Sequence, residues 1–317
     1  MNSKTHLARF FAQAGNKLAS VSRRLAPSEP ALPANRFLSF FYPGHFYSPI
    51  PDPEFVDKNA ETLFKTDIMS LPGIDDNWPG QLELLRQMLD RANDYQPLFS
   101  RAEGESGGAR FFSDNTFFKE FDTFVYCDFL RRFQPRQIVE VGSGFTSALA
   151  LDVAEKFIQS RPRFVFIEPF PDRLRGLIKP HELANISIHE RPVQQVDKSV
   201  FKNLGAGDFL FVDSSHVSKI GSDVNFLFLD VLPELAQGVI VHIHDIFWPF
   251  EYPKAWLDEG RIWNEAYLLR GMLAHSSRYR ILFFNSEMKV RRPEMLQQLP
   301  DWAKPGQAQS IWLEVVA

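Results

Sequence analysis

Hydrophobic and polar positions follow two alternating patterns in the second part of the chain. From residue 137 onward, short continuous apolar runs are followed by segments whose apolar residues recur at helical spacing. The runs predict strands at 137–141, 163–167, 185–189, 208–212, 238–243, 279–284 and 311–316. The segments between them predict helices near 145–160, 171–180, 196–203, 220–236 and 264–275. This alternation is typical of an α/β fold, a mostly parallel sheet covered by helices on both faces.

The last two predicted strands, 279–284 and 311–316, have no clear long helix between them. Parallel neighbours need a long crossover connection, whereas antiparallel neighbours do not. We therefore expect an antiparallel ribbon at one edge of a seven-stranded, doubly wound sheet.

The first 114 residues are patterned differently. Residues 1–26 carry five basic side chains, no acid and apolar residues at helical spacing, which predicts a basic amphipathic helix. Residues 27–35 contain three prolines and indicate a linker. Residues 36–56 interleave aromatic residues with prolines, which favours an ordered, irregular segment over a helix or a strand.

Further along, helices are predicted at 80–99 and 117–133, on either side of a polar loop at 101–110. The predicted division is an arm and linker at 1–35, a helical and irregular cap at 36–114, and the α/β domain at 115–317. The arm is expected to be a helix packed on its own domain or on a partner, or a frayed tail. Its basic face would also suit an anionic membrane surface, and its composition is that of a mitochondrial transit peptide as well.

Composition narrows the class of protein. The 317 residues are 44% hydrophobic and 23% charged, as in globular proteins. The net charge of −4 gives no bulk basicity, so no nucleic-acid partner is expected. The single cysteine, Cys127, fits a reducing compartment and predicts a cytoplasmic protein. No run of 18 apolar residues occurs, so we expect no transmembrane helix.

Residues 139–147, VEVGSGFTS, connect the first predicted strand to the first helix. Gly142 and Gly144 leave room for a ligand to touch backbone, and the helix N-terminus offers free N–H groups. Ser147 stands where a dinucleotide fingerprint has its third glycine, so that fingerprint is incomplete. Glu168, 24 residues after Gly144, ends the second strand, where an acid can bind ribose hydroxyls. Together these features favour a nucleoside-type cofactor over a plain tight turn.

Residues 239–249, VIVHIHDIFWP, place histidines and an aspartate at the end of a hydrophobic strand. Ligands of open parallel sheets bind beyond the carboxyl ends of the strands, where His244 and Asp245 stand. His242 lies two residues deeper, so we expect it to be a buried structural histidine. Strand alternation predicts His242 and His244 on one face and Asp245 on the other.

The E-x-G-x-G of Glu140, Gly142 and Gly144, with Glu168 downstream, resembles the class I methyltransferases that use S-adenosylmethionine and have a Rossmann-like fold. Residues 207–249 are similar to a bacterial branch of that fold, often called the type-24 methyltransferases. That branch has an acid and a histidine after strand four and a His–Asp pair after strand five. The positions that fall on this pattern are Asp213, His216, Asp223, His244 and Asp245. The likeness covers about residues 115–317.

The resemblance implies roles for particular residues. The methionine part and the ribose of the cofactor would be surrounded by Glu140, Gly142, Ser143, Gly144 and Phe145. Glu168 would bind the ribose hydroxyls, and Val193 and Gln194 would lie near the adenine. Asp213 and Ser214 would line the pocket at the end of strand four.

Three interpretations of the polar strand ends stay open. A hydroxyl acceptor must lose its proton, so His244 or His216 is the candidate base, with Asp245 orienting the base or the acceptor. Alternatively, His216 and Asp245 bond to each other or to backbone and brace the loops. Lastly, Asp213, His244 and Asp245 hold a divalent cation; oxygen ligands favour Mg²⁺ or Ca²⁺, and a histidine shifts the preference toward Mn²⁺, Fe²⁺ or Zn²⁺.

The expected activity is methyl transfer from S-adenosylmethionine, with an optional divalent cation, to a hydroxyl of a small-molecule or glycan-type acceptor. Aromatic stretches at 37–55, 246–256 and 262–269 suit acceptor walls or plain domain packing. Asn264, Glu265 and Tyr267 share that ambiguity. The alternatives are an NAD(P)-dependent Rossmann oxidoreductase, which Ser147 disfavours, and a non-catalytic cofactor-binding scaffold.

Overall fold

The computed structural model describes residues 41–98, 110–112, 115, 117–306 and 308–317. The chain divides into two compact units, Met1–Leu63 and Phe64–Ala317. The predicted arm and linker, residues 1–35, lie outside the described residues, as does the predicted loop 101–110 apart from Arg110. The predicted boundary between cap and domain at residue 115 stays a prediction; helix α4 (Trp78–Leu89) contacts strand β6 (Tyr279–Phe284) of the same unit.

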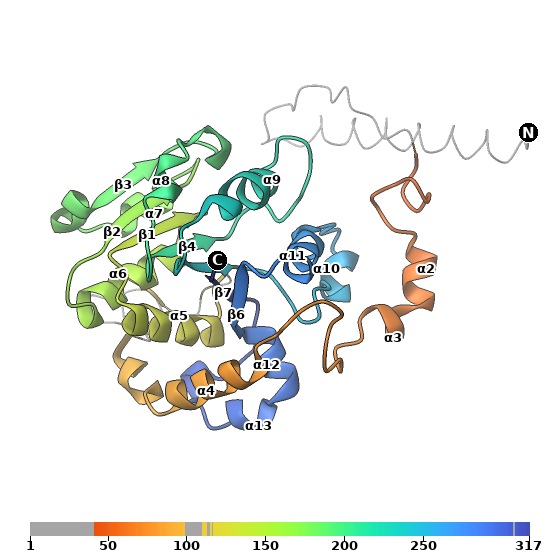
Figure 1. Ribbon diagram of the computed structural model, residues 1–317, viewed down its shortest axis with the longest axis horizontal. Helices are drawn as coiled ribbons and strands as arrows, with labels where there is room; N and C mark the ends of the chain where they lie inside the picture. The colour runs from red at the N-terminus through yellow and green to blue at the C-terminus, as the bar shows by residue number, and fades with distance from the viewer. Residues whose placement is uncertain (1–40, 99–109, 113–114, 116, 307) are drawn as a thin grey trace, which may run out of the picture. The chain divides into compact units, whose positions relative to one another are not determined.

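One mixed sheet forms the centre of the second unit, with the strand order β3-β2-β1-β4-β5-β7-β6 (Figure 1). Its strands are β1 Gln137–Val141, β2 Arg163–Ile167, β3 Ile186–His189, β4 Phe209–Val212, β5 Ile240–Ile243, β6 Tyr279–Phe284 and β7 Ile311–Val315. Strands β1 to β5 are parallel, and β7 pairs antiparallel with both β5 and β6. The predicted strands and the antiparallel edge ribbon are therefore confirmed.

Helices of the second unit connect the strands. The α-helices are α4 Trp78–Leu89, α5 Glu120–Phe133, α6 Phe145–Phe157, α7 Asp172–Leu177, α8 Ser199–Lys202, α9 Asp223–Asn225, α10 Lys254–Asp258, α11 Glu265–Ala274, α12 Asn285–Arg291 and α13 Pro293–Leu296. Short 3₁₀ turns are η1 Ala92–Leu98, η2 Pro180–Asn185, η3 Val193–Gln195, η5 Leu232–Glu234 and η6 Asp301–Ala303, and Phe226–Val231 is a π-helical turn.

The helix expected at 80–99 ends at Leu89, and the 3₁₀ turn η1 follows it. Two other predicted helices also differ from the observed ones. The helix expected at 220–236 is broken into α9, the π-helical turn and η5, because Pro233 has no N–H to donate and its ring clashes with the preceding turn. The helix expected from residue 117 begins at Glu120 instead. The Asn115 side chain accepts hydrogen bonds from the backbone N–H groups of Phe117 and Phe118, which forms a turn before it.

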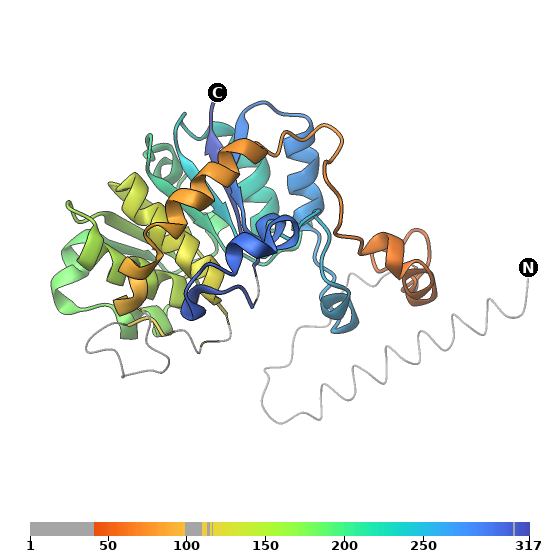
Figure 2. The same ribbon diagram turned by 90° about the horizontal axis from the view of Figure 1, so that it is seen from below.

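Helices cover both faces of the sheet (Figures 1 and 2). Alternate strand residues such as Ile138 and Phe211 pack with α4, α5, α6, α12 and α13, and their neighbours such as Val139 and Val212 pack with α8, α9 and α11. Since helices cover both faces, the central strands β1, β2, β4 and β5 are mostly apolar, and Glu140 and His242 are buried polar exceptions in them.

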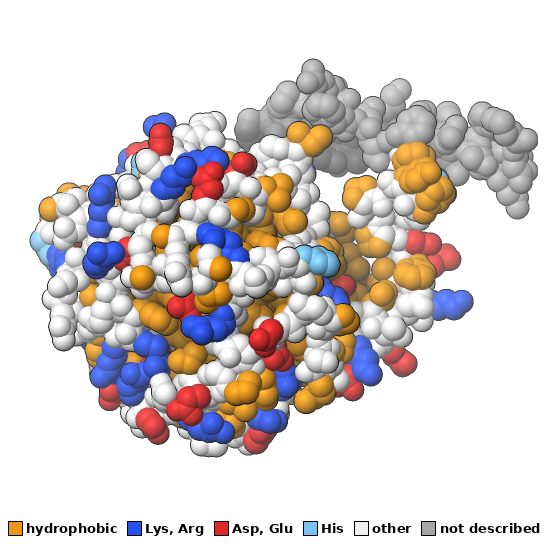
Figure 3. Space-filling view, viewed as in Figure 1, with side chains coloured by type: hydrophobic (Ala, Val, Ile, Leu, Met, Phe, Trp, Pro, Cys, Tyr) orange, Lys and Arg blue, Asp and Glu red, His pale blue; other side chains and the backbone are white. Residues whose placement is uncertain are grey.

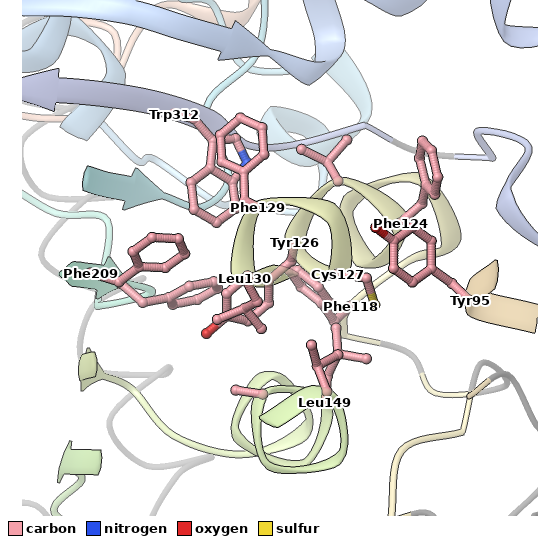
Figure 4. Packing of buried hydrophobic residues seen from close by; sticks show 14 of the residues in the cluster. Tyr95, Phe118, Phe124, Tyr126, Cys127, Phe129, Leu130, Leu149, Phe209 and Trp312 are labelled. Carbon is pink, nitrogen blue, oxygen red and sulfur yellow. The ribbon is translucent and has the colours of Figure 1, made fainter. Parts of the chain in front are cut away.

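Aromatic side chains fill the core beneath α5 (Figure 4). The ring centroid of Phe129 lies 4.6 Å from that of Trp312, and that of Tyr126 lies 4.9 Å from that of Phe211. Cys127 is free and buried in the same cluster, and burial raises the pKa of its thiol well above the ordinary value. Helix α5 is thus fixed against the sheet.

The described part of the first unit is a short irregular segment followed by α2 (Pro53–Lys58) and α3 (Ala60–Leu63). The expectation that residues 36–56 contain no helix is wrong from Pro53 onward, because the Asp52 side chain caps the helix and Pro53 suits its first turn. The exposed large hydrophobic residues of the first unit are Tyr42, Phe46, Tyr47, Ile50 and Phe55.

Basic and acidic side chains are interspersed over the face of the second unit seen in Figure 3. Among the described residues, no helix combines the length and the apolar character needed to cross a bilayer.

Candidate functional site

Gly142 joins the end of β1 to the end of β4. Its φ is +79°, and its N–H donates to the carbonyl of Ile167 at 3.1 Å. A Cβ atom at this position would lie 1.8 Å from the carbonyl oxygen of Asp213, so only glycine fits. The N–H of Asp213 in turn donates to the carbonyl of Val141 at 2.9 Å. The predicted glycine turn and the predicted acid of strand four therefore lie side by side.

Glu168 ties the end of β2 to the same turn. Its Oε2 accepts a hydrogen bond from the N–H of Ser143 at 3.1 Å, and its Oε1 accepts one from the N–H of Phe170 at 2.9 Å. A carboxylate has further lone pairs beyond these two bonds. Glu168 therefore lies where the sequence predicted an acid beside the glycine turn, with capacity to accept hydroxyl donors.

Glu140 is a buried carboxyl with an unpartnered oxygen. Thr146 Oγ1 donates to its Oε1, whereas its Oε2 has no partner among the described residues. Burial raises the pKa of Glu140 to about 8, although Thr146 and Ser147 oppose the shift. Ser147 also accepts a hydrogen bond from the N–H of Gly144 at 3.0 Å. The residue that breaks the dinucleotide fingerprint therefore stabilises the turn itself.

Two hydroxyl groups near the turn also have no partner among the described residues: Ser143 Oγ and Ser214 Oγ, both buried. A buried polar atom without a partner costs roughly 1–3 kcal/mol. With Glu140 Oε2, these atoms flank the glycine turn and the end of β4. Such unpartnered atoms are what a polar ligand bound at these strand ends would satisfy.

The other predicted cofactor residues are placed less centrally. The Phe145 ring lies edge-on to Phe112, with centroids 5.1 Å apart, and the guanidinium of Arg173 lies 5.4 Å from its centroid. Val193 is buried in the core, and the Gln194 side chain donates to the carbonyl of Gly221 at 2.9 Å. The hydrogen bonds of the described residues do not connect Val193 or Gln194 with the glycine turn.

His216 lies at the centre of a group of carboxylates. Its Nε2 is 3.4 Å from Asp213 Oδ1 and 3.4 Å from Asp245 Oδ2, and its Nδ1 is 2.8 Å from Glu265 Oε2. His216 and Asp245 have φ values of +59° and +56°, which non-glycine residues rarely adopt. The backbone N–H groups of Asn264 and Glu265 donate to the carbonyl of His216, so α11 is fixed to this loop.

The histidine and the three carboxyl groups around it shift one another's pKa values. Burial alone would lower the pKa of His216, but hydrogen bonds to Asp213 and Glu265 and the charge of Asp245 raise it well above its usual value. Burial raises the pKa of Glu265 and of Asp245, with His216 opposing both shifts. The raised pKa favours the imidazolium form of His216, and its contacts with the three carboxylates also brace the loops.

The same geometry suits a divalent cation. Asp213, His216 and Asp245 each offer one ligand atom, and these atoms lie within 4.8 Å of one another. The nitrogen donor of this group is His216, where the sequence predicted His244. Glu265 holds Nδ1 and leaves Nε2 facing the two aspartates, the outer contact that metal-ligating histidines usually have.

His244 and Asp245 meet at the end of β5. His244 Nε2 lies 3.6 Å from Asp245 Oδ1, His244 Nδ1 lies 3.1 Å from Ser310 Oγ, and Gln309 Nε2 donates to Asp245 Oδ1. The prediction that Asp245 faces the other side of the sheet is wrong, because its left-handed backbone ends the strand alternation. Burial would lower the pKa of His244, but Asp245, Asp213 and Asp122 raise it overall.

His242 lies in the core, as predicted. It is 1% exposed, and its ring stacks on Phe211 with centroids 3.7 Å apart. Neither ring nitrogen has a hydrogen-bond partner among the described residues. Burial, together with the charge of His244, lowers the pKa of His242 well below its usual value, so this ring is neutral.

Aromatic residues after β5 pack beside the His216 group. The Trp263 ring lies 4.4 Å from that of His216 and 5.2 Å from that of Trp256, which also contacts Phe247 at 4.9 Å. The predicted stretches 246–256 and 262–269 thus pack on each other. The Asn264 side chain does not cap α11; it accepts a hydrogen bond from the N–H of Ser218 at 2.6 Å.

Sequence reasoning missed three residues of this site. They are Asp122 on α5 and Gln309 and Ser310 just before β7, and all three are buried. Ser310 Oγ contacts His244, the Gln309 side chain donates to Asp245, and the charge of Asp122 raises the pKa of His244. Asp122 interrupts the otherwise apolar run of α5, which is a detectable signal. Gln309 and Ser310 gave no such signal in the sequence, because their partners are more than 60 residues away along the chain.

Comparison with known proteins gives the following matches. Residues 139–246 match the family described as "Methyltransferase domain". An uncharacterized protein of Archaeoglobus fulgidus is 37% identical over 169 residues, which cover 52% of this chain and 73% of that protein. The family match extends from β1 to the residue after Asp245, so it includes the glycine turn, Glu168 and the His216 loop.

Solved structures give weaker likenesses. The S-adenosylhomocysteine-bound methyltransferase PaMTH1 of Podospora anserina has a TM-score of 0.41 at 14% identity, covering 84% of this chain and 97% of that chain. The O-methyltransferase TomG of Streptomyces achromogenes, in complex with S-adenosylmethionine, has a TM-score of 0.40 at 14% identity, covering 83% and 96%. An apo-structure of CmcI has a TM-score of 0.40 at 16% identity, covering 71% and 84%.

Proposed function

We propose that this chain, whose residues 139–246 match a methyltransferase domain, uses S-adenosylmethionine to methylate a hydroxyl group of a small-molecule or glycan-type acceptor. The observation that carries this proposal is the contact between Gly142 and Asp213. It puts the glycine turn directly beside the end of β4, where the acid–histidine group begins. Cofactor and acceptor chemistry would then share one crevice.

The residues of the crevice fit the cofactor. Glu140 Oε2, Ser143 Oγ and Ser214 Oγ are buried polar atoms in need of partners, and Glu168 keeps free lone pairs beside the turn. We assign the ribose hydroxyls to Glu168 and the polar methionine part to the Glu140 side of the turn. When bound, the cofactor supplies an electrophilic methyl group on a sulfonium.

The residues at the end of β5 are suited to the acceptor. His216 already holds three carboxylates, so it is poorly placed to take a further proton. His244 Nε2 and Asp245 Oδ1, 3.6 Å apart, can together hold the hydrogen of an acceptor hydroxyl. We therefore assign His244 as the proton acceptor and Asp245 as the group that orients the hydroxyl, and most of the rate to alignment.

Turnover with labelled S-adenosylmethionine and a panel of phenols, catechols and sugars tests this proposal. His244→Ala should reduce kcat by about 10²–10⁴-fold, the usual contribution of a general base, with little change in cofactor affinity. The matched control is His275→Ala, an exposed histidine at the end of α11. Full activity of His244→Ala would place the base elsewhere, and no transfer to any acceptor would favour a cofactor-binding scaffold.

We also propose that the protein works in a reducing compartment, the cytoplasm. Cys127 is the single cysteine of the chain, and it is free and buried. One cysteine cannot form an internal disulfide, and proteins of reducing compartments usually have none.

A further inference from the structure

Arg173 is a cation that lies on the glycine turn without an anionic partner. It is an exposed residue of α7, the helix that follows Glu168. Its guanidinium carbon lies 5.1 Å from the centroid of the Phe117 ring and 5.4 Å from that of the Phe145 ring. Within the described part of the chain, this guanidinium forms no ion pair and no hydrogen bond. Its N–H donors are therefore available to a ligand, while the two rings hold the group in place.

The guanidinium lies over Gly144, the residue from which α6 begins. A Cβ atom added at Gly144 would lie 3.7 Å from Arg173 Nη1 and 3.8 Å from Arg173 Cδ. Gly144 is the N-cap of α6, a helix of 13 residues, and the N-terminus of a helix carries a partial positive charge. A group that approaches the start of α6 therefore meets a full positive charge as well as a partial one.

The Phe145 ring beneath Arg173 lies on the face of the sheet toward which Glu140 points. This ring packs against the core cluster that contains Ile138 of β1. Glu140 follows Ile138 by two residues in the same strand, so its side chain points to the same face. Thr146, the residue after Phe145, donates to Glu140 Oε1. Glu140 and Arg173 are thus on one side of the sheet, next to the start of α6.

The charges of the proposed cofactor are complementary to this arrangement. S-adenosylmethionine has one anionic group, the carboxylate of its methionine part, and an ammonium group on the same carbon atom. Glu140, Glu168 and Asp213 around the turn are acids, so they suit ammonium or hydroxyl groups and repel a carboxylate. A carboxylate bound here needs a cation, and the planar fork of an arginine fits both of its oxygens. Arg173 supplies that cation with its charge uncompensated.

We propose that Arg173 binds the carboxylate of the cofactor's methionine part, with Phe117 and Phe145 holding the guanidinium over the start of α6. This inference rests on the proposed function, because it needs the same cofactor. The competing view is that Arg173 only packs α7 against α6. A packing role would not depend on whether the ligand has a carboxylate.

Calorimetric titration of the full chain with two ligands separates these views. S-adenosylhomocysteine has the carboxylate, whereas its decarboxylated form keeps the adenosine, the sulfur and the ammonium group but lacks the carboxylate. Arg173→Ala should weaken the binding of S-adenosylhomocysteine by roughly 10–100-fold, the usual effect of losing a hydrogen-bonded charge partner. The same variant should bind the decarboxylated ligand as the wild-type protein does. Arg173→Lys keeps the charge without the fork, and should regain part of the lost affinity.

The matched control is Arg175→Ala, an exposed arginine of the same helix that forms an ion pair with Glu190. This variant should bind both ligands as the wild-type protein does. An equal loss of affinity for both ligands in Arg173→Ala, or no loss for either, would overturn the inference and leave the proposed function standing. A wild-type protein that binds neither ligand would overturn the proposed cofactor, and this inference with it.

Discussion

At the scale of single residues, Gly142 shows how one missing side chain lets the β1 turn lie against the end of β4. The carbonyl of Asp213 lies where a Cβ atom of residue 142 would be. The φ of Gly142 is +79°, a value that would strain any other residue. Gly144, two positions later, has an extended φ of 178°, and the nearest atom to its absent Cβ is 3.7 Å away, on Arg173. The two glycines of the motif therefore have different reasons to be glycine.

Alanine substitution should separate these two glycines. Gly142→Ala should lower the free energy of unfolding by at least ~2 kcal/mol and weaken cofactor binding more than tenfold, because the β1 turn must move away from β4. Gly144→Ala should fold with nearly wild-type stability. Thermal melts and calorimetry with S-adenosylhomocysteine measure both effects, and equal behaviour of the two variants would contradict this account.

The buried carboxyl of Glu140 makes the free energy of unfolding depend on pH. Its pKa rises from an ordinary 4.5 to about 8 in the folded protein, chiefly because burial disfavours the charged form. The folded chain therefore binds more protons than the unfolded chain between these values. Its stabilisation is complete below 4.5 and is lost, by about 1.4 kcal/mol per pH unit, as the pH rises toward 8.

Glu140→Gln should remove that dependence, because glutamine stays neutral while keeping its polar shape. The melting temperature of the variant, relative to wild type without cofactor, should increase steadily from pH 5 to pH 8.5. Melts in matched buffers measure this difference. A constant difference across the range would show that Glu140 ionises normally in the folded protein.

At the scale of elements, strand identity followed from sequence because the central strands are buried on both faces and are mostly continuous apolar runs. The loops were harder, because their shapes depend on distant partners. Asp245 leaves the strand alternation through a left-handed backbone, which is uncommon outside glycine. Gly142, Glu168 and Asp245 were identified from their places at strand ends, and Glu140 and Asp213 through the resemblance to the methyltransferases. Gln309 and Ser310 became visible only after β7 was seen beside β5.

The loops after β4 and β5 and the start of α11 create the candidate cation site, so its test belongs at this scale. If a cation completes the site, a chelator should abolish turnover, and Mn²⁺ or Mg²⁺ should restore it. Glu265→Gln should weaken the binding of that cation by roughly 10–100-fold, since Nδ1 of His216 loses its carboxylate partner. Indifference to the chelator would leave the His216 group as a brace between the loops.

At the scale of the whole molecule, the sheet order explains why these residues meet. Strands β1, β2, β4 and β5 are adjacent and parallel, so their carboxyl ends share one edge. Helix α5, before the first strand, closes that edge from one face through Asp122, and α11 closes it from the other through Glu265. Residues from across the chain therefore converge on the ends of four neighbouring strands.

Calorimetric titration of the full chain with S-adenosylhomocysteine, and with NAD in parallel, tests this convergence most directly. Glu168→Ala serves as the site variant, because Glu168 is the acid that we assign to the ribose. The account predicts saturable binding of S-adenosylhomocysteine, at least tenfold weaker binding to Glu168→Ala, and no binding of NAD. Equal affinity of the wild-type protein and the Glu168→Ala variant for S-adenosylhomocysteine would contradict the account, and so would tighter binding of NAD.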